Sequence, residues 1–240
     1  MAIELPQPVA DFLNFIGISW PQVNEDSVRE FATHVRTFAS GIEGTHQDAT
    51  ATLSAMNSSY QANSYDLLVS KWAHLSQGHM QDLLDGCSVL ATALDAAADY
   101  IVGLKMECIA ELGVLAASFV ADQAAAIATL GLAEAAEALI VKAAEKLVEF
   151  LKQELIQYIT AQVINAALTP LLGVVEKAVA GMSYSALEDM LGVSGGGPGD
   201  GWMVHPEELR GHAEKFGAHA ETARGHAQNF ASNMSGVSFT

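Results

Sequence analysis

The sequence predicts an all-α protein built around an elongated antiparallel helical hairpin. Half of the 240 residues are apolar, yet only 7% are aromatic and 6 are Pro, a composition that favours helices with small-residue packing. Two long stretches carry apolar residues at alternating steps of three and four, which is the helical heptad pattern. A net charge of -17 repels phosphate backbones and argues against nucleic-acid binding.

The first long helix is expected after a break in periodicity. A short apolar piece between Val9 and Ile16 precedes the run Gly17-Ile18-Ser19-Trp20-Pro21, after which Asn24 or Asp26 can cap a helix. The stripe that follows spans about four heptads. Its members are Val28, Phe31, Val35, Phe38, Ile42, Ala49 and Met56, with Thr45 and Thr52 in the two remaining seam positions.

A second stripe begins beyond the polar connection Asn57-Ser58-Ser59. It comprises Leu68, Trp72, Leu75, His79, Leu83, Cys87, Leu90, Leu94, Ala97, Ile101 and Leu104, with a one-residue slip near Leu83. Because the connection is short, the two stripes should pack as antiparallel arms, each roughly 45 Å long or more.

Further helices extend the hairpin into a bundle. Residues 109–132 are apolar nearly all round, and a turn at Gly131 should lead to a helix with Leu139, Ala143, Leu147 and Leu151 on its apolar face. The uncharged run 155–175 contains Pro170, which would kink or end a helix. We therefore predict a helical bundle domain over residues 1–191, a Gly-rich linker at 192–204 and a C-terminal amphipathic helix at 205–240.

The C-terminal helix carries a coiled-coil seam and a ladder of histidines. Leu209, Phe216, Ala223 and Phe230 repeat every seven residues, interleaved with Ala213, Ala220 and Ala227. His205, His212, His219 and His226 share one heptad phase and are expected to flank that seam. Imidazole titrates near pH 6.5, so the ladder is either a pH-sensitive seam or simple filling of the seam edge.

The residues offer no evident chemistry. Histidines seven apart on one helix lie about 10.5 Å apart, too far to share a metal ion. No nucleophile with a base, catalytic carboxylate pair or phosphate loop stands out, so we expect neither an enzyme nor a cofactor. Cys87 and Cys108 lie about 31 Å apart on a continuous helix and read as small core residues.

Residues 1–15 contain no Lys or Arg and so do not resemble a secretory signal peptide, which means that any export must use another route. Both 109–132 and 155–175 are apolar enough to consider as membrane segments, although Asp122 would lie mid-bilayer in the first. Core helices of a soluble bundle explain both runs. A membrane-inserting, channel-forming domain using helices within 109–180 is the alternative.

Several motifs resemble one family. They are Gly17-Ile18-Ser19-Trp20-Pro21, Glu25-Asp26 with Arg29, Phe31 and Ala32, Ser59-Tyr60-Gln61-Ala62-Asn63, Trp72, and the stretch Leu94–Tyr100 with Lys105. Together, over residues 1–190, they are similar to the WXG-like N-terminal domains of actinobacterial type VII (ESX) secreted proteins. Those domains include ones from mycobacterial channel proteins that carry a necrosis-inducing toxin at the other end.

The resemblance implies recognition residues. Tyr60 and Ala62 take the places of the Trp and Gly that name the WXG family, and Trp72 belongs to the second arm. Tyr184 with Glu188 fits the Tyr-x-x-x-Asp/Glu signal by which type VII substrates are read.

By resemblance, the chain is a type VII secretion substrate or trafficking module, the N-terminal carrier domain of a secreted toxin. It would be secreted or exposed at the cell surface without a cleaved signal peptide. Its expected partners are a cognate helical WXG-like protein or secretion chaperone, the ESX machinery and a second copy of itself. A purely structural coiled-coil assembly factor is a further alternative.

Overall fold

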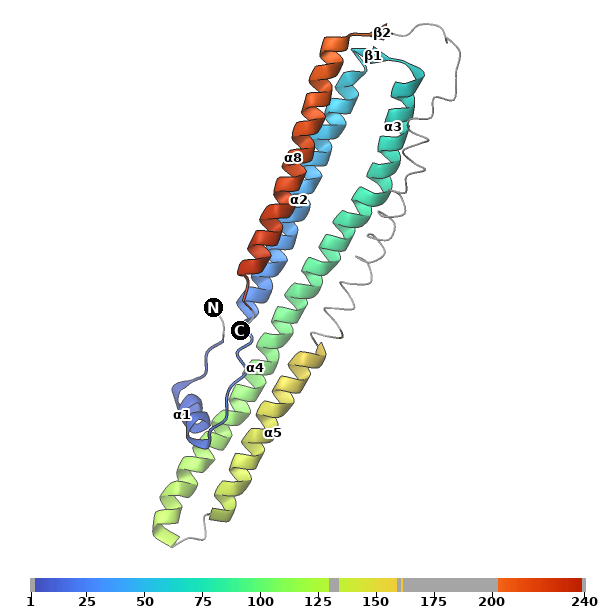
Figure 1. Ribbon diagram of the computed structural model, residues 1–240. Helices are drawn as coiled ribbons and strands as arrows, with labels where there is room; N and C mark the ends of the chain where they lie inside the picture. Colours follow the sequence, from blue (N-terminus) through green and yellow to red (C-terminus); the bar gives the residue numbers. More distant parts are fainter. Residues whose placement is uncertain (1–2, 130–133, 159–160, 162–202, 239–240) are drawn as a thin grey trace. The chain divides into compact units, whose positions relative to one another are not determined.

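The computed structural model describes residues 3–129, 134–158, 161 and 203–238 (Figure 1). The predicted all-α class is confirmed. The helices are α1 (Gln7–Ile16), α2 (Glu25–Met56), α3 (Asn63–Leu75), a π-turn (Ser76–Met80), α4 (Gln81–Thr129), α5 (Glu134–Tyr158) and α8 (Pro206–Gly236). Two short strands accompany them, β1 (Tyr60–Gln61) and β2 (Met203–Val204). The predicted turn at Gly131, Pro170 and residues 192–202 of the predicted linker lie outside the described residues.

The fold divides into two compact units. Of the described residues, unit 1 holds 3–31, 92–129, 134–158, 161 and 237–238, and unit 2 holds 32–91 and 203–236. Both α2 and α4 therefore contribute residues to each unit.

Local signals set the start of α2. The preceding helix α1 ends at Gly17, whose φ of 73° lies in the left-handed region that glycine adopts without strain. The side-chain oxygen of Asn24 accepts hydrogen bonds from the backbone N–H groups of Asp26 at 3.0 Å and Ser27 at 3.2 Å. Asn24 is therefore the N-cap residue of α2, one of the two predicted candidates.

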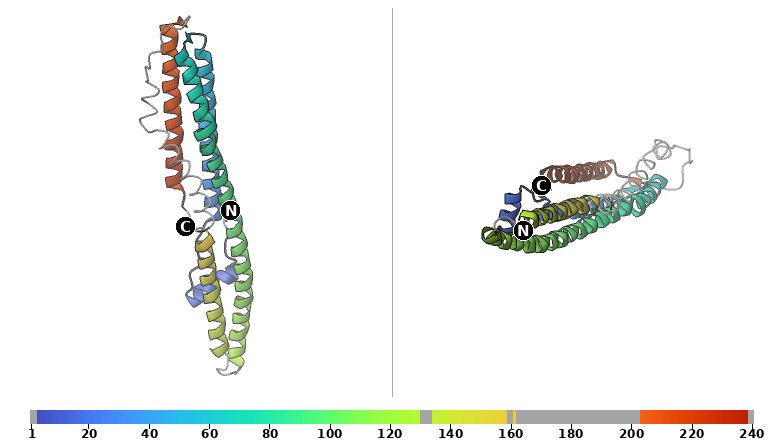
Figure 2. Two further views of the ribbon diagram at one scale, coloured as in Figure 1. Left: turned by 90° about the vertical axis from the view of Figure 1, so that its right-hand side faces the viewer. Right: turned by 90° about the horizontal axis from the view of Figure 1, so that it is seen from below.

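In unit 1, α2 runs antiparallel to α4. Glu25 pairs with Lys105 and, one turn later along α2, Arg29 pairs with Asp99. The α5 helix returns alongside α4 (Figure 2). Two contacts join them: Gln123 bonds to Glu137, and the ring of Tyr100 stacks on that of Tyr158 with centroids 3.9 Å apart. A core cluster fills the space among these helices and α1, formed by Val9, Phe12, Leu13, Leu112, Ala116, Phe119, Ala144 and Val148.

The predicted apolar face of α5 is correct in its second half and wrong in its first. Leu151 is buried and Leu147 is half-buried against the core cluster, as predicted. Leu139 is 68% exposed and Ala143 is exposed, and Ala144 and Val148 are buried instead. Steps of three and four can be counted from either residue of a neighbouring pair, so the periodicity alone does not choose between the two faces.

In unit 2, the hairpin is again antiparallel. The His46 ring nitrogen Nε2 lies 2.8 Å from the Ser76 hydroxyl, Trp72 donates to Thr50, and the Tyr65 hydroxyl donates to the Leu53 carbonyl. The π-turn at Ser76–Met80 accommodates the predicted one-residue slip near Leu83, since a π-turn closes i to i+5 and adds one residue to the helix. The antiparallel hairpin predicted from the two stripes is thus confirmed.

A buried ion pair anchors the start of α2 in unit 1. The side chains of Glu25 and Lys105 are 1% and 3% exposed, and Lys105 Nζ lies 2.6 Å from Glu25 Oε2. The other Glu25 oxygen accepts the Ile3 backbone N–H, and Lys105 also donates to the Val23 carbonyl at 2.5 Å. Each charge therefore has hydrogen-bond partners, which is the condition under which a buried pair is tolerated.

Removing one partner of this pair should be costly. We expect Lys105→Met to lower the free energy of unfolding by about 3–5 kcal/mol, because Glu25 is left buried without its cation. Urea denaturation followed by circular dichroism measures this loss. The matched control is Asp99→Asn, which breaks the exposed Arg29 pair and should cost at most about 1 kcal/mol. A Lys105→Met loss no larger than that of the control contradicts the anchoring role.

The same pair predicts a dependence on pH. Burial raises the pKa of Glu25, but hydrogen bonds from Lys105 and the Ile3 amide outweigh it and leave the pKa below the ordinary 4.5. The stabilisation is present above pH 4.5 and is lost as the pH falls through the lower folded value. Denaturation at a series of pH values below 4.5 should show this loss in the wild type and a smaller one in Glu25→Gln.

Candidate functional site

The turn between the hairpin arms is tied to the start of α8. Strand β1 pairs antiparallel with β2, with Tyr60 opposite Val204 and Gln61 opposite Met203. The Ser59 carbonyl also accepts the His205 backbone N–H at 2.9 Å. The chain entering α8 is therefore fixed at the tip of the hairpin within unit 2.

Two of the expected recognition residues, Tyr60 at the turn and Trp72 in the second arm, converge on one cluster. Both pack against the buried side chains of Leu53, Met56 and Tyr65, together with Leu68, Leu209 and Phe216. The Tyr60 ring meets Tyr65 edge-on at 6.4 Å, and its hydroxyl bonds to Ser64.

Ala62 has a different role from its neighbours. It precedes α3 in extended conformation (φ -162°, ψ 161°), and its carbonyl accepts the Tyr65 N–H at 2.9 Å. Any residue adopts this conformation, so nothing in the backbone here demands the glycine that the WXG pattern has.

Trp72 holds the two arms together. Its indole N–H donates to the Thr50 hydroxyl at 2.9 Å, and its ring stacks on the His46 imidazole at 4.9 Å and meets the Phe216 ring edge-on at 6.0 Å. Burial lowers the pKa of His46, so this imidazole favours its neutral form. A cavity of about 240 Å³ lies beside these rings, lined also by Thr45, Ala49, Met80 and His219.

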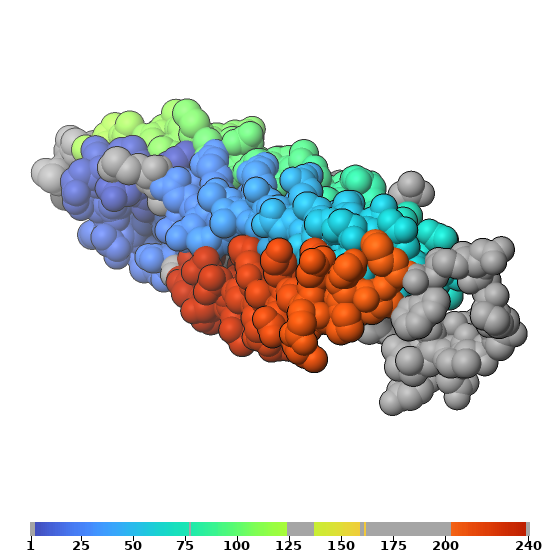
Figure 3. Space-filling view, turned by 90° about the horizontal axis from the view of Figure 1, so that it is seen from above, coloured from blue at the N-terminus to red at the C-terminus, as the bar shows by residue number. Residues whose placement is uncertain are grey.

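The α8 helix packs antiparallel along α2 in unit 2 (Figure 3). Phe38 meets Phe230 with ring centroids 5.1 Å apart, and the Thr52 hydroxyl lies 2.9 Å from His219 Nε2. The facing residues of α8 are Leu209, His212, Phe216, His219, Ala223, His226 and Phe230, all half-buried.

This arrangement corrects the predicted position of the histidines. His212, His219 and His226 lie inside the seam, where they alternate with the apolar residues, and do not flank it. Ala213, Ala220 and Ala227, which were expected in the seam, are exposed. Both sets lie at alternating steps of three and four from Leu209 and Phe216, so spacing could not separate them. His205 precedes α8 and is exposed.

Gly41 makes room for one of these histidines. A Cβ at this position would lie 2.7 Å from Nδ1 and 2.8 Å from Cε1 of the His226 ring. The imidazole of His226 therefore lies directly against the backbone of α2, a contact that only glycine permits. No comparable neighbour lies near Gly44, three residues further along the same helix.

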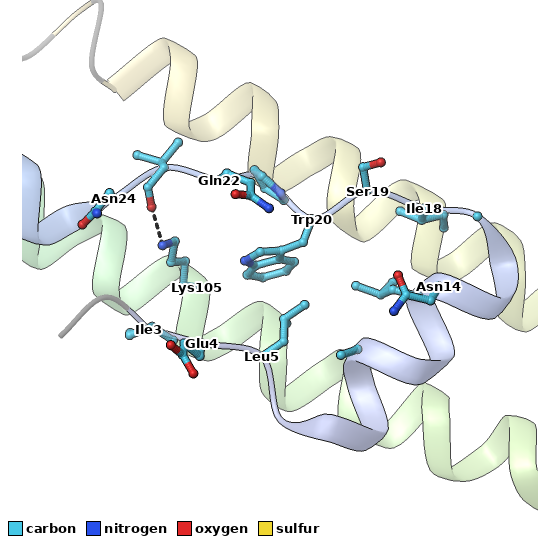
Figure 4. A pocket seen from close by; sticks show the side chains of 15 residues that line it. Ile3, Glu4, Leu5, Asn14, Ile18, Ser19, Trp20, Gln22, Asn24 and Lys105 are labelled. Carbon is cyan, nitrogen blue, oxygen red and sulfur yellow. Dashed lines mark hydrogen bonds between the residues drawn. The ribbon is translucent and has the colours of Figure 1, made fainter. Parts of the chain in front are cut away.

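The motif Gly17-Ile18-Ser19-Trp20-Pro21 lies in unit 1 (Figure 4). It forms the extended connection between α1 and α2 and lines a cavity of about 680 Å³ together with Ile3, Leu5 and Lys105. The indole of Trp20 lies between the two extended segments, and Lys105 reaches the Val23 carbonyl beside it. The motif therefore lines the same cavity as Lys105, a member of the buried ion pair.

The remaining predictions concern the export signal, metal binding and membrane crossing. Tyr184 and Glu188 lie outside the described residues. Across the described part of the chain, no three His, Cys, Asp or Glu side chains are grouped to hold a metal ion. Among the described helices, no stretch combines the length and hydrophobicity that a membrane crossing requires.

Comparison with known proteins agrees with the hairpin and the motifs that it carries. The family profile described as "WXG100 like domain" matches residues 4–148. The chain belongs to the WXG100-like family. It is therefore a helical protein related to type VII secretion, a class whose members pair with helical partners. No curated protein and no solved structure matches the chain.

For this WXG100-like chain, the sequence missed several residues of the site. His46 and Thr50 were not singled out, although counting back equally from the turn along both arms would have placed them opposite Trp72. Gly41 gave no signal, because a helical glycine is informative only once the neighbouring helix is known.

A substitution at Gly41 tests the contact between α2 and α8. Alanine in a helix interior is ordinarily more favourable than glycine by up to about 1 kcal/mol, so Gly44→Ala should be neutral or stabilising. Gly41→Ala should instead loosen α8, because its methyl group displaces the His226 ring. Hydrogen exchange of α8 amides measures the effect. Equal protection of α8 in both variants would show that the close approach does not exist in solution.

Proposed function

We propose that the chain is a type VII secretion substrate or trafficking module, the N-terminal carrier domain of a secreted toxin, which acts by helical recognition rather than catalysis. The observation that carries the proposal is the WXG100-like match over the helices that form the hairpin. Export would proceed without a cleaved signal peptide, to the exterior or the cell surface.

An exposed apolar face on α4 supports recognition by a helical partner. In unit 1, Met106, Val114 and Val120 are 60%, 67% and 68% exposed, and the small residues Ala110 and Ala117 between them are exposed as well. At 100° per residue all five lie within about one third of the helix circumference. Large apolar side chains grouped in this way on one face are typical of interaction surfaces.

The charges beside this face favour a particular partner. Glu107 and Glu111 are exposed at one edge of it, and the whole chain has 28 acidic against 11 basic residues. Like-charge repulsion disfavours a second copy of the chain. We therefore propose a cognate WXG-like helix or chaperone with an apolar stripe and basic flanking residues, since e and g charges select partners in helical pairs.

Tyr184 and Glu188 are the proposed export signal, read by the ESX machinery. Replacing both by alanine should abolish export from a host with an intact ESX system, because the Tyr-x-x-x-Glu pattern is lost. Immunoblots of culture filtrate and cell lysate measure the exported share. Ser185→Ala, in the same segment but outside the pattern, is the control and should be exported normally. Unchanged export of the double variant would eliminate this signal.

The α4 face is tested by a buried-charge substitution. Val114→Glu should weaken partner binding more than about tenfold, since taking a carboxylate out of water at an apolar interface costs several kcal/mol. Leu139→Glu on α5 is the matched control, because Leu139 is 68% exposed and Val114 is 67% exposed. Co-purification with a co-expressed WXG-like partner gives the readout, and circular dichroism verifies folding. If both variants bind equally well, the α4 face is not the partner surface.

A further inference from the structure

The contact between α8 and α2 is built from half-buried residues. No residue of α8 is buried, and its contact face joins aromatic and aliphatic side chains to three histidines. Because burying a residue only in part recovers part of its hydrophobic free energy, this packing holds α8 less firmly than a core helix is held. The contact is therefore one that a modest change at the interface can reverse.

Hydrogen bonds determine which ring nitrogen carries the proton in two imidazoles at this contact, those of His219 and His46. Thr52 donates its hydroxyl proton to the Asp48 carbonyl at 3.0 Å, so the bond to His219 requires Nε2 to be the donor. Ser76 likewise donates to the Trp72 carbonyl at 2.8 Å, and His46 Nε2 is the donor to Ser76. In both residues the second proton of an imidazolium would go to Nδ1.

His212 has no place for a second proton. Its Nδ1 is buried and has no hydrogen-bond partner among the described residues. His212 lies one turn from Leu209 and Phe216, both of which pack on the cluster of Leu53, Met56 and Tyr65. An imidazolium donates from both nitrogens, so protonation would bury an N–H without an acceptor beside an apolar cluster, which is unfavourable.

The histidines at this contact, His212, His219 and His226, form no ion pair with the described residues. The titratable and charged groups on the elements packed against α8 are His34, Arg36, Glu43, His46 and Asp48 on α2, Asp66, Lys71 and His74 on α3, His79 in the π-turn, and Asp82 and Asp85 on α4. Glu43 and Asp48 are exposed. On α8 itself, Glu208, which lies one turn before His212, is exposed, as are Glu214 and Lys215, whereas Glu207 and Glu221 pair with Arg210 and Arg224.

From these contacts we infer that the groove of α2 and α3 is a helix-binding surface that α8 covers while its histidines are neutral and uncovers when they are protonated. The occupant released is α8 itself, and the surface exposed contains Phe38, Trp72 and the α2 residues that line one side of the 240 Å³ cavity. That a partner helix then uses the groove rests on the proposed function, whereas the release does not.

The sign of the pH effect follows from where the protons bind. In the docked form Nδ1 of His212 is buried without a hydrogen-bond partner among the described residues, and burial lowers the pKa of His46, which lines the cavity that α8 helps to close. The undocked form therefore binds more protons below about pH 6.5, and acidification favours it. For each histidine that takes up a proton on release, the docking constant falls by up to about tenfold per pH unit.

The experiment measures docking directly in the full chain. Donor and acceptor dyes are attached to Gln47→Cys on α2 and Ala227→Cys on α8, both exposed positions. The native thiols stay unlabelled at pH 7, because burial raises the pKa of Cys87 and raises that of Cys108 to about 11. We expect energy transfer to fall between pH 7.5 and 5.5 with a midpoint below 6.5, without loss of helical circular dichroism.

Substitutions identify the groups responsible. The triple variant His212→Gln, His219→Gln and His226→Gln keeps a side-chain N–H but cannot titrate, and its energy transfer should stay high at both pH values. The controls His74→Gln and His205→Gln, at exposed positions outside the contact, should behave as the wild type. If the triple variant does not dock at pH 7.5, the three single variants test the inference instead. Each should lower by about one the number of protons taken up when α8 is released.

Two outcomes overturn the inference. Wild-type energy transfer that stays constant from pH 7.5 to 5.5 excludes release, and a full transition in the triple variant excludes these histidines as its cause. Both results concern the purified chain alone. Export of the Tyr184 and Glu188 variants is measured separately, so failure of one proposal leaves the other standing.

Discussion

The buried pair of Glu25 and Lys105 determines where α2 begins on α4. Alanine is frequent among the buried residues of the long helices, as at Ala32, Ala91, Ala97 and Ala98, and small uniform side chains discriminate poorly between heptad registers. A buried carboxylate finds its ammonium partner in only one register, and any other leaves a charge without compensation. The same carboxylate also binds the Ile3 amide, so the N-terminal segment is ordered by the choice of register.

Unit 2 uses polar residues for a related purpose. Thr45 and Thr52 are buried seam residues whose hydroxyls bond to the Gly41 and Asp48 carbonyls of their own helix, so their burial leaves no unpaired donor. Thr52 can then also accept from His219. A polar contact of this kind selects one arrangement of helices without the adhesion of an apolar core, which suits a surface that exchanges its occupant.

Aromatic, imidazole and charged side chains join the helices within each unit. At the hairpin, the rings of His46 and Trp72 stack on each other, and in unit 1 Lys105 forms an ion pair with Glu25. The residues that resemble the family pattern are largely those that join helices: Glu25 with Lys105, Arg29 with Asp99, and Trp72 with Thr50. The pattern therefore corresponds to contacts that fix how the helices pack.

The sequence by itself determined the elements that depend on local chemistry. The Asn24 cap, the turn after Met56 and the slip near Leu83 each arise from a few neighbouring residues and from helical periodicity, so all could be predicted. The antiparallel hairpin followed from a short connection between two apolar stripes.

Only the tertiary structure decided which faces meet. Heptad counting admits His212 or Ala213 beside Leu209, and Ala143 or Ala144 on α5, because steps of three and four start equally well from adjacent residues. The neighbouring helix decides between these faces. Because Gly41 has no side chain, the His226 ring fits against the backbone of α2, and the histidines face inward. Contacts between residues far apart in sequence carry no periodic signal, and for that reason Lys105 could be recognised as the partner of Glu25 only in the folded chain.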